Sequence, residues 1–194
     1  GSADESEKEK IKKKIIKLQK DTLKTCLDSL YNVNTYTNFE VVIVENNSTT
    51  KEIFEYYDSI QKEHSNIKVV TYKGDFNYSA INNYGVTFAS GDYLLFLNND
   101  TEMINPNSLS EMLGCCMRDE VGIVGAKLLY EDDTVQHGGV VIGFGGFAGH
   151  VFTGINKDDY GYMVRARINC NYSAVTAACM LVKKECFDQV HGFS

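Results

Sequence analysis

Two clusters of polar side chains in this sequence have the composition needed to hold a nucleotide and a metal ion. Glu45-Asn46-Asn47-Ser48 follows the apolar run 39–44, and Asn98-Asn99-Asp100-Thr101-Glu102 follows the apolar run 93–97. Asparagine and aspartate side chains can hydrogen-bond a nucleobase edge or ribose hydroxyls. A carboxylate can also hold magnesium or manganese against a diphosphate. The same residue types favour Asx turns and helix caps, so both interpretations are open at this point.

The elements that must position these clusters predict an α/β fold, with a mostly parallel sheet flanked by helices. Strands are expected at residues 39–44, 67–72, 93–97 and 121–129. Helices are expected at residues 5–31, 79–89, 106–117 and 183–190, and a further helix runs from a cap at Ser48 or Thr49 to residue 63. Nearly continuous apolar strands are typical of sheets covered on both faces. In such sheets ligands bind beyond the carboxyl ends of the strands, where both clusters lie. Beyond Glu131 a Gly-rich pattern predicts an irregular, mixed C-terminal part.

The composition disfavours several classes of protein. Acidic residues outnumber basic ones by 26 to 19, so the net charge of −7 argues against nucleic acid as a partner and suits a divalent cation. No apolar run reaches the roughly 18 residues of a membrane span, and no signal peptide is visible. The six cysteines show no C-x-x-C spacing and are expected to be reduced, as in a cytoplasmic protein. The lysine-rich stretch 1–24 is interpreted as an exposed helix face, and the alternatives are contact with another subunit or a peripheral contact with the inner face of a membrane.

Four blocks, in the same order, resemble family 2 glycosyltransferases with the GT-A fold. They are Phe39–Thr49, Phe76–Gly85 continued by Ala89–Glu102, Val135–Val140, and Val175–Phe187. The similarity is strongest to a bacterial branch whose rhamnosyltransferase-like members build surface polysaccharides. It predicts a GT-A domain over residues 21–194, incomplete at both ends, and a basic helical extension over residues 1–20.

The resemblance implies an inverting transfer of a hexosyl or deoxyhexosyl group from a nucleotide-diphospho-sugar to a glycan or lipid-linked acceptor. By matching position, the expected donor-binding residues are Glu45, Asn46, Asn77, Asn82, Asn98, Asn99 and Asp100. Asp100 closes the D-x-D region and is the expected ligand of magnesium or manganese. His137 and Thr176 lie in the later blocks and are expected on the acceptor side. The catalytic base is expected beyond Ser194, because an acidic pair normally follows that point in the family.

The sequence departs from the family pattern in ways that keep rival functions open. Asn82 stands where many relatives have an arginine facing the diphosphate, and the D-x-D region contains a single acid. Members of the family open with a hydrophobic strand, for which only residues 14–18 are a candidate here. The rivals are a nucleotide-sugar binding module or inactive fragment, and a nucleotidyltransferase. The second would normally bring a Gly-rich phosphate loop, which is not visible.

Three further features of the second half could belong to a site. Gly143–Ala148 fits a dinucleotide fingerprint, but no helix-forming run follows it, so a substrate flap is the favoured interpretation. For His150 a structural role is favoured over that of a ligand or an acceptor contact. An acceptor groove and a plain exposed surface are both open for Tyr160, Tyr162, Arg165 and Arg167.

Overall fold

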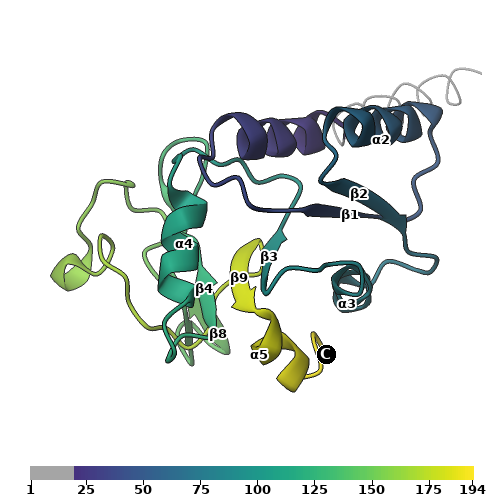
Figure 1. Cartoon of the computed structure of the whole chain (residues 1–194). Coiled ribbons are helices and arrows are strands. Elements are labelled where there is room, and N and C mark those ends of the chain that lie inside the picture. Colours follow the sequence, from purple (N-terminus) through teal and green to yellow (C-terminus); the bar gives the residue numbers. More distant parts are fainter. Residues whose placement is uncertain (1–19) are drawn as a thin grey trace, which may run out of the picture. The chain divides into compact units, whose positions relative to one another are not determined.

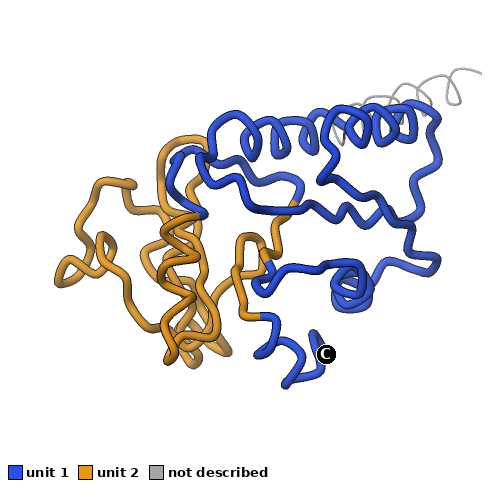
Figure 2. The backbone as a smooth tube through the Cα atoms, in the orientation of Figure 1, with its two compact units in different colours: residues 1–94, 99–109, 184–194 blue, residues 95–98, 110–183 orange. Residues whose placement is uncertain are grey.

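The computed structural model describes residues 20–194, which form two compact units (Figure 1, Figure 2). Among the described residues, unit 1 contains residues 20–94 together with Asn99–Leu109 and Lys184–Ser194. Unit 2 contains Leu95–Asn98 and Ser110–Lys183. The predicted α/β class is confirmed. Residues 1–19 of the expected helical extension lie outside the described residues. They include the candidate for a first strand at residues 14–18.

Unit 1 is built on a parallel pair of strands, β1 (Val41–Glu45) and β2 (Ile67–Thr71). A helix described over residues 20–32 and α2 (Lys51–Glu63) lie on the same side of this pair (Figure 1). Their apolar faces form a buried core with β2, made of Leu23, Leu27, Ile53, Tyr57, Ile60 and Ile67. Burying each such aliphatic side chain stabilises the fold by about 1.5–3 kcal/mol relative to exposing it.

The helix α3 (Tyr78–Val86) covers the opposite face of β1 (Figure 1). Side chains alternate along a strand, so Val41 and Ile43 face the core above while Val44 faces α3. Gly85 allows the close approach, because a Cβ at this position would lie 2.7 Å from Val44 Cγ2. Helices on both faces explain why β1 is apolar from Val41 to Val44. The expected cap of α2 is wrong: its N-cap is Thr50, whose side chain makes no capping hydrogen bond.

The last residues of the chain fold back onto α3 within unit 1. This segment follows α5 (Lys184–Gln189) and includes Phe193. The Asn83 side chain forms two hydrogen bonds with the backbone of Phe193, as one strand does with its neighbour. Asn83 Nδ2 donates to the Phe193 carbonyl at 2.8 Å, and Asn83 Oδ1 accepts from the Phe193 N–H at 2.9 Å. Ser79 Oγ donates to the Ser194 carbonyl at 2.9 Å. Ser194 therefore lies beside the first turn of α3.

The strand β3 (Tyr93–Leu97) belongs to a different sheet, in the order β3-β9-β4, with β9 at Cys179–Lys183 and β4 at Ile123–Gly125. In a doubly wound sheet the strands lie side by side in the order 3-2-1-4. The first strand of the sequence therefore lies between the second and the fourth and pairs with both. Within residues 20–194 no strand precedes β1, and β1 and β3 lie in separate sheets. Parallel pairing joins β1 to β2, whereas β9 pairs with β4 in the antiparallel direction.

The rest of unit 2 is a set of short antiparallel pairs, as the mixed pattern predicts. The strand expected at 121–129 is two strands, because the chain changes partner after β4 and β5 (Leu128–Leu129) pairs with β6 (Val135–His137). The pair β7 (Val140–Ile142) and β8 (Ala148–His150) encloses the Gly-rich stretch as a hairpin turn. Residues 108–116 form α4 (Ser108–Cys116), and Tyr162–Val164 form a short 3-10 turn, η1.

Two predictions made from composition can be compared with the structure. All six cysteines are free thiols, as expected. Among residues 20–194, no helix has the length and apolar character that crossing a bilayer would require.

Candidate functional site

The polar cluster after β1 holds two strand-end loops together. The Glu45 side chain is 4% exposed, and its Oε1 accepts a hydrogen bond from the Ser48 N–H at 2.6 Å. Asn46 Nδ2 donates to the carbonyl oxygens of Tyr72 and Gly74, and Asn47 Nδ2 donates to Gly74 as well. Both amides thus tie the end of β1 to the loop that follows β2. These contacts give Glu45 and Asn46 a positioning role in addition to the predicted donor contact.

Both predicted site residues on α3 engage their own helix. Asn77 is the N-cap of α3, and its Oδ1 accepts from the Ala80 N–H at 2.9 Å. Asn82 Nδ2 donates to the Tyr78 carbonyl at 2.8 Å, one turn earlier. The side chain at this position therefore folds back along the helix. The arginine that many relatives have at this position has a longer side chain than Asn82, and it ends in a charged, forked guanidinium group.

The cluster after β3 presents two exposed carboxylates, Asp100 and Glu102, of which Asp100 is the expected metal ligand. Asn98 is half-buried, whereas Asn99 and Asp100 are exposed. The negative charge of Asp100, after burial itself, raises the pKa of the Cys26 thiol to about 11, which places Asp100 near the helix of residues 20–32. The segment beyond Asp100 is anchored to the same helix, because the buried Ser29 hydroxyl accepts from the Met103 N–H at 2.9 Å. Ser29 was not predicted, since nothing in its sequence neighbourhood signals a contact 74 residues away.

The residues around Asp100 fit a hard cation that is held mainly by its substrate. Among residues 20–194, no three His, Cys, Asp or Glu side chains gather into a metal-binding group. Asp100 supplies one carboxylate, and Asn98 and Asn99 offer amide oxygens in the same stretch of chain. Magnesium typically takes one or two protein carboxylates and completes its shell with phosphate oxygens and water.

The predicted acceptor-side residues His137 and Thr176 are in direct contact in unit 2. His137 is 1% exposed, and its Nε2 accepts from the Thr176 N–H at 3.4 Å. Its Nδ1 lies 2.8 Å from Nδ1 of His150, with the two rings edge to face. Burial, and then the neighbouring His150, lowers the pKa of His137 to about 4, so the ring is neutral. The sequence did not show that His150 would be the partner of His137.

The glycines that follow His137 are explained by aromatic rings packed on the backbone. A Cβ at Gly139 would lie 2.3 Å from Cδ2 of Tyr172, and Gly139 has a φ of +126°. A Cβ at Gly138 would lie 3.3 Å from Cδ2 of Phe152. These rings fix the backbone that carries His137. The glycines of the Gln-His-Gly-Gly block therefore let aromatic rings pack against the backbone beside the buried His137 imidazole.

A cavity of about 520 Å³ opens beside this histidine pair, entirely within unit 2. It is lined by Leu128, Tyr130, Gln136, His137, His150, Thr153, Thr176 and Ala178. Its wall is connected to the end of β3, because the Asn98 N–H donates to the Ala178 carbonyl at 2.9 Å. The structure therefore places one member of the predicted donor cluster next to the predicted acceptor-side residues.

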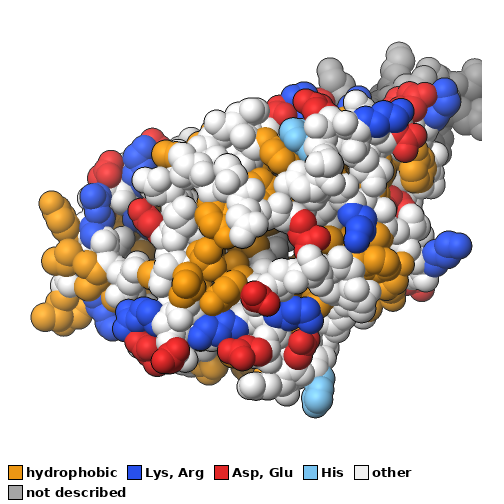
Figure 3. All heavy atoms as spheres, viewed as in Figure 1, with side chains coloured by type: hydrophobic (Ala, Val, Ile, Leu, Met, Phe, Trp, Pro, Cys, Tyr) orange, Lys and Arg blue, Asp and Glu red, His pale blue; other side chains and the backbone are white. Residues whose placement is uncertain are grey.

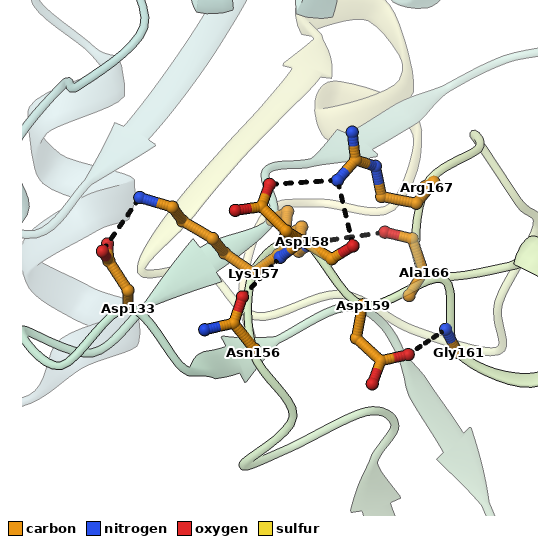
Figure 4. Close-up of polar contacts among 9 residues, drawn as sticks. Asp133, Asn156, Lys157, Asp158, Asp159, Gly161, Ala166 and Arg167 are labelled. Carbon is orange, nitrogen blue, oxygen red and sulfur yellow. Dashed lines mark hydrogen bonds and ion pairs between the residues drawn. The ribbon is translucent and has the colours of Figure 1, made fainter.

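A polar network fixes the loop between residues 156 and 167 (Figure 4). Arg167 pairs with Asp158 at 3.1 Å, Lys157 pairs with Asp133 at 2.9 Å, and the Gly161 N–H donates to Asp159 at 2.7 Å. The loop nevertheless exposes apolar side chains, with Tyr162 74% and Met163 73% exposed. Figure 3 shows hydrophobic side chains gathered at this loop, at the left of the view. Tyr160 is also exposed, and the guanidinium carbon of Arg167 lies over its ring at 5.9 Å from the ring centre.

Comparison with known proteins gives two kinds of similarity. Residues 15–190 match the family described as glycosyl transferase family 2. The chain is 42% identical over 177 residues to the O-antigen biosynthesis protein RfbC of Myxococcus xanthus, covering 89% of this chain and 14% of that protein. It is 40% identical over 174 residues to the uncharacterized protein y4gI of Sinorhizobium fredii, covering 90% of this chain and 19% of that protein. The chain thus spans less than a fifth of the length of these relatives.

The fold is similar to that of a solved mannosyltransferase, PcManGT from Pyrobaculum calidifontis, determined in complex with GDP-Man and Mn²⁺. The TM-score is 0.61 at 12% sequence identity, and the match covers 90% of this chain and 44% of that chain. At this level of identity the likeness concerns the fold alone, and it confirms the expected GT-A-like architecture.

Proposed function

The chain belongs to glycosyl transferase family 2, and on that premise we propose that it binds a nucleotide-diphospho-sugar and transfers the sugar to a glycan or lipid-linked acceptor. The observation that carries the proposal is the exposed Asp100 directly after β3, in a GT-A-like fold. The transferred group is a hexosyl or deoxyhexosyl unit, and the product a surface polysaccharide. The named relative in O-antigen biosynthesis and the GDP-Man of the structural neighbour support this choice.

The donor is held by the strand-end clusters. Asn46 and Asn47 fix the loop after β2, and Glu45 fixes the turn that leads to Ser48, so the base and ribose meet a preformed surface. Asn77 and Asn82 shape the beginning of α3. A magnesium or manganese ion would sit at Asp100 with Asn98 and Asn99 nearby, and would neutralise the charge of the departing nucleoside diphosphate.

The transfer is an inverting, in-line displacement in which an acceptor hydroxyl attacks the anomeric carbon. Its proton must pass to a base on the acceptor side. The cavity of unit 2 has no Asp or Glu in its lining, so we infer that the base lies outside the residues that line it.

Calorimetric titration with UDP, dTDP and GDP, each with and without manganese, tests the donor site. We expect one nucleotide to bind only when manganese is present, which identifies the donor class. Absence of binding to all three, in a folded protein, would overturn the proposal.

A binding module without turnover is the second candidate, because the described residues offer no carboxylate in the role of base beside the cavity of unit 2. Release of free nucleotide from the matching nucleotide-sugar, followed by chromatography, separates the two functions. Turnover with an acceptor supports the transferase, and binding without turnover supports the module.

A further inference from the structure

We propose that the cavity beside His137 and His150 binds one neutral sugar ring, which His150 holds by donating a hydrogen bond from Nε2. The identification of this ring as part of the acceptor rests on the proposed function. The binding site itself rests on the geometry of unit 2 alone.

The lining of the cavity has the chemistry of a carbohydrate site. No Lys, Arg, Asp or Glu side chain contributes to it, so nothing in the wall balances the charge of a phosphate or a nucleotide. The polar groups are an amide at Gln136, hydroxyls at Thr153 and Thr176, and the imidazole of His150. Tyr130 adds a half-exposed aromatic ring on which the C–H face of a sugar can pack. A volume of about 520 Å³ accommodates a hexopyranose with bound water.

The hydrogen bonds of the histidine pair determine which nitrogen of each ring carries a proton. His137 Nε2 accepts from the Thr176 N–H, so the neutral ring must carry its proton on Nδ1. That proton is donated to His150 Nδ1 at 2.8 Å, which makes His150 Nδ1 an acceptor. With its Nδ1 accepting, His150 carries its own proton on Nε2.

This tautomer gives His150 a defined role. Its Nε2–H is a donor and can bind a hydroxyl or ring oxygen of a sugar. It cannot take a proton from an attacking hydroxyl, because Nε2 is already protonated. His150 is therefore a binding residue and is excluded as the base. His137 is a positioning residue, which acts by fixing the tautomer and the ring orientation of His150.

A chain of hydrogen bonds connects this cavity to the end of β3. The Asn98 N–H donates to the Ala178 carbonyl at 2.9 Å, and the Ala178 N–H donates to Thr176 Oγ1 at 3.4 Å. Thr176 in turn donates its N–H to His137. The cavity wall is thus held in register with the first residue of the predicted donor cluster, as a site for the acceptor requires.

The test uses ¹⁵N-labelled histidine in NMR spectra of the protein, titrated with methyl α-mannopyranoside, methyl α-rhamnopyranoside and methyl β-glucopyranoside. We expect His137 as the Nδ1–H tautomer, His150 as the Nε2–H tautomer, and shifts of His150 on addition of at least one glycoside. Inorganic phosphate, as a charged probe, should leave His150 unshifted. His150→Ala should weaken glycoside binding about threefold to tenfold, the range for one hydrogen bond. His150→Gln keeps an N–H near the Nε2 position and should restore part of the binding.

His137→Asn keeps a donor near the Nδ1 position and tests the positioning role, since His150 should retain its tautomer. Tyr160→Ala is the matched control, because Tyr160 is 65% exposed in the same unit and does not line the cavity. Loss of glycoside binding in Tyr160→Ala but not in His150→Ala would overturn the proposal and assign binding to the loop at 156–167. Equal binding by His150→Ala and wild type, the opposite tautomers, or no shift with any glycoside would also overturn it. Nucleotide binding is measured separately, so failure of the donor site leaves this test unaffected.

Discussion

At the scale of single residues, the proposed donor site depends on Asp100. It is the one acid in Asn98-Asn99-Asp100, and no three His, Cys, Asp or Glu side chains gather around it among the described residues. We expect Asp100→Ala to abolish manganese-dependent nucleotide binding, because a cation held by phosphates and amides alone loses its charged protein ligand. Calorimetry measures the binding, and circular dichroism verifies the fold.

Asp58→Ala is the control for this variant, since Asp58 is an exposed carboxylate on α2. It should bind as wild type does. Unchanged manganese-dependent affinity in Asp100→Ala would contradict the assignment.

His137 makes the stability of unit 2 depend on pH. Its pKa is lowered to about 4, whereas an ordinary histidine titrates near 6.5. Between these values the unfolded chain binds a proton that the folded chain does not. Stability is therefore complete above about pH 6.5 and falls as the pH drops toward 4, by at most about 3 kcal/mol. Urea unfolding at a series of pH values should show this slope, and His137→Asn should flatten it.

Carboxylates provide the background to this measurement. The hydrogen bonds from the Ser90 hydroxyl and N–H lower the pKa of Glu40, so its contribution to stability is lost only at more acidic pH. That loss should be the same in wild type and His137→Asn. Identical slopes in both proteins above pH 5 would show that His137 is not the titrating group.

Residue types and spacing predicted where the polar clusters lie but not which partners they bind. The position of Asn46 at a strand end follows from the apolar run before it, and its contact with Gly74 depends on the pairing of β1 with β2. Likewise, His137 stands in a recognisable block, whereas His150 reaches it only because the hairpin of β7 and β8 folds back. Contacts of this kind need the tertiary structure.

At the scale of elements, Gly85 controls how closely α3 approaches β1. Replacing glycine by alanine inside a helix normally stabilises it by roughly 1 kcal/mol. At Gly85 the added Cβ would lie 2.7 Å from Val44 Cγ2, so the sign should reverse. We expect Gly85→Ala to lower the free energy of unfolding by about 1–3 kcal/mol, the usual cost of overpacking.

The chain offers a matched control for this variant in α4. A Cβ at Gly114 meets nothing within 4 Å, so Gly114→Ala should be neutral or stabilising. Urea unfolding of both variants under one condition decides the point. Two variants of equal stability would show that the contact between Gly85 and Val44 does not limit packing.

A second element-scale contact joins the helix of residues 20–32 to the segment after Asp100. Ser29 Oγ accepts from the Met103 N–H and donates to the Cys26 carbonyl. Ser29→Ala leaves a buried N–H without its partner, at a cost of about 1–3 kcal/mol. We also expect weaker manganese-dependent nucleotide binding, because the segment that carries Asp100 loses an anchor. Loss of stability with unchanged nucleotide affinity would restrict Ser29 to a structural role.

Local pattern predicted the elements well where a strand keeps one partner. The bounds of β3, Tyr93–Leu97, coincide with the apolar run. The prediction of one strand at 121–129 was wrong for a physical reason. The Ala126 N–H still donates to the Cys179 carbonyl, whereas Leu128 pairs with His137 on another strand. An apolar run does not show where the chain changes partner, because both halves are equally hydrophobic.

At the scale of the whole molecule, the six free cysteines report on burial in both units at once. Cys26 in unit 1 and Cys116 and Cys179 in unit 2 are buried, whereas Cys186 in unit 1 and Cys115 and Cys170 in unit 2 are partly accessible. The thiolate is the reactive form, and the pKa of Cys26 is raised to about 11, so Cys26 is doubly protected. We expect three thiols to react quickly with a disulfide reagent at pH 8 and three only on unfolding.

Mass spectrometry of the labelled peptides assigns each rate to a residue and thereby to a unit. One slow thiol in unit 1 and two in unit 2 would show that each unit has its own closed core. Rapid labelling of Cys116 and Cys179 together, with Cys26 still protected, would contradict the packing of unit 2 and leave that of unit 1 intact. Because no disulfide links the two units, a reducing agent should change neither the rates of unfolding nor the order in which the thiols become reactive.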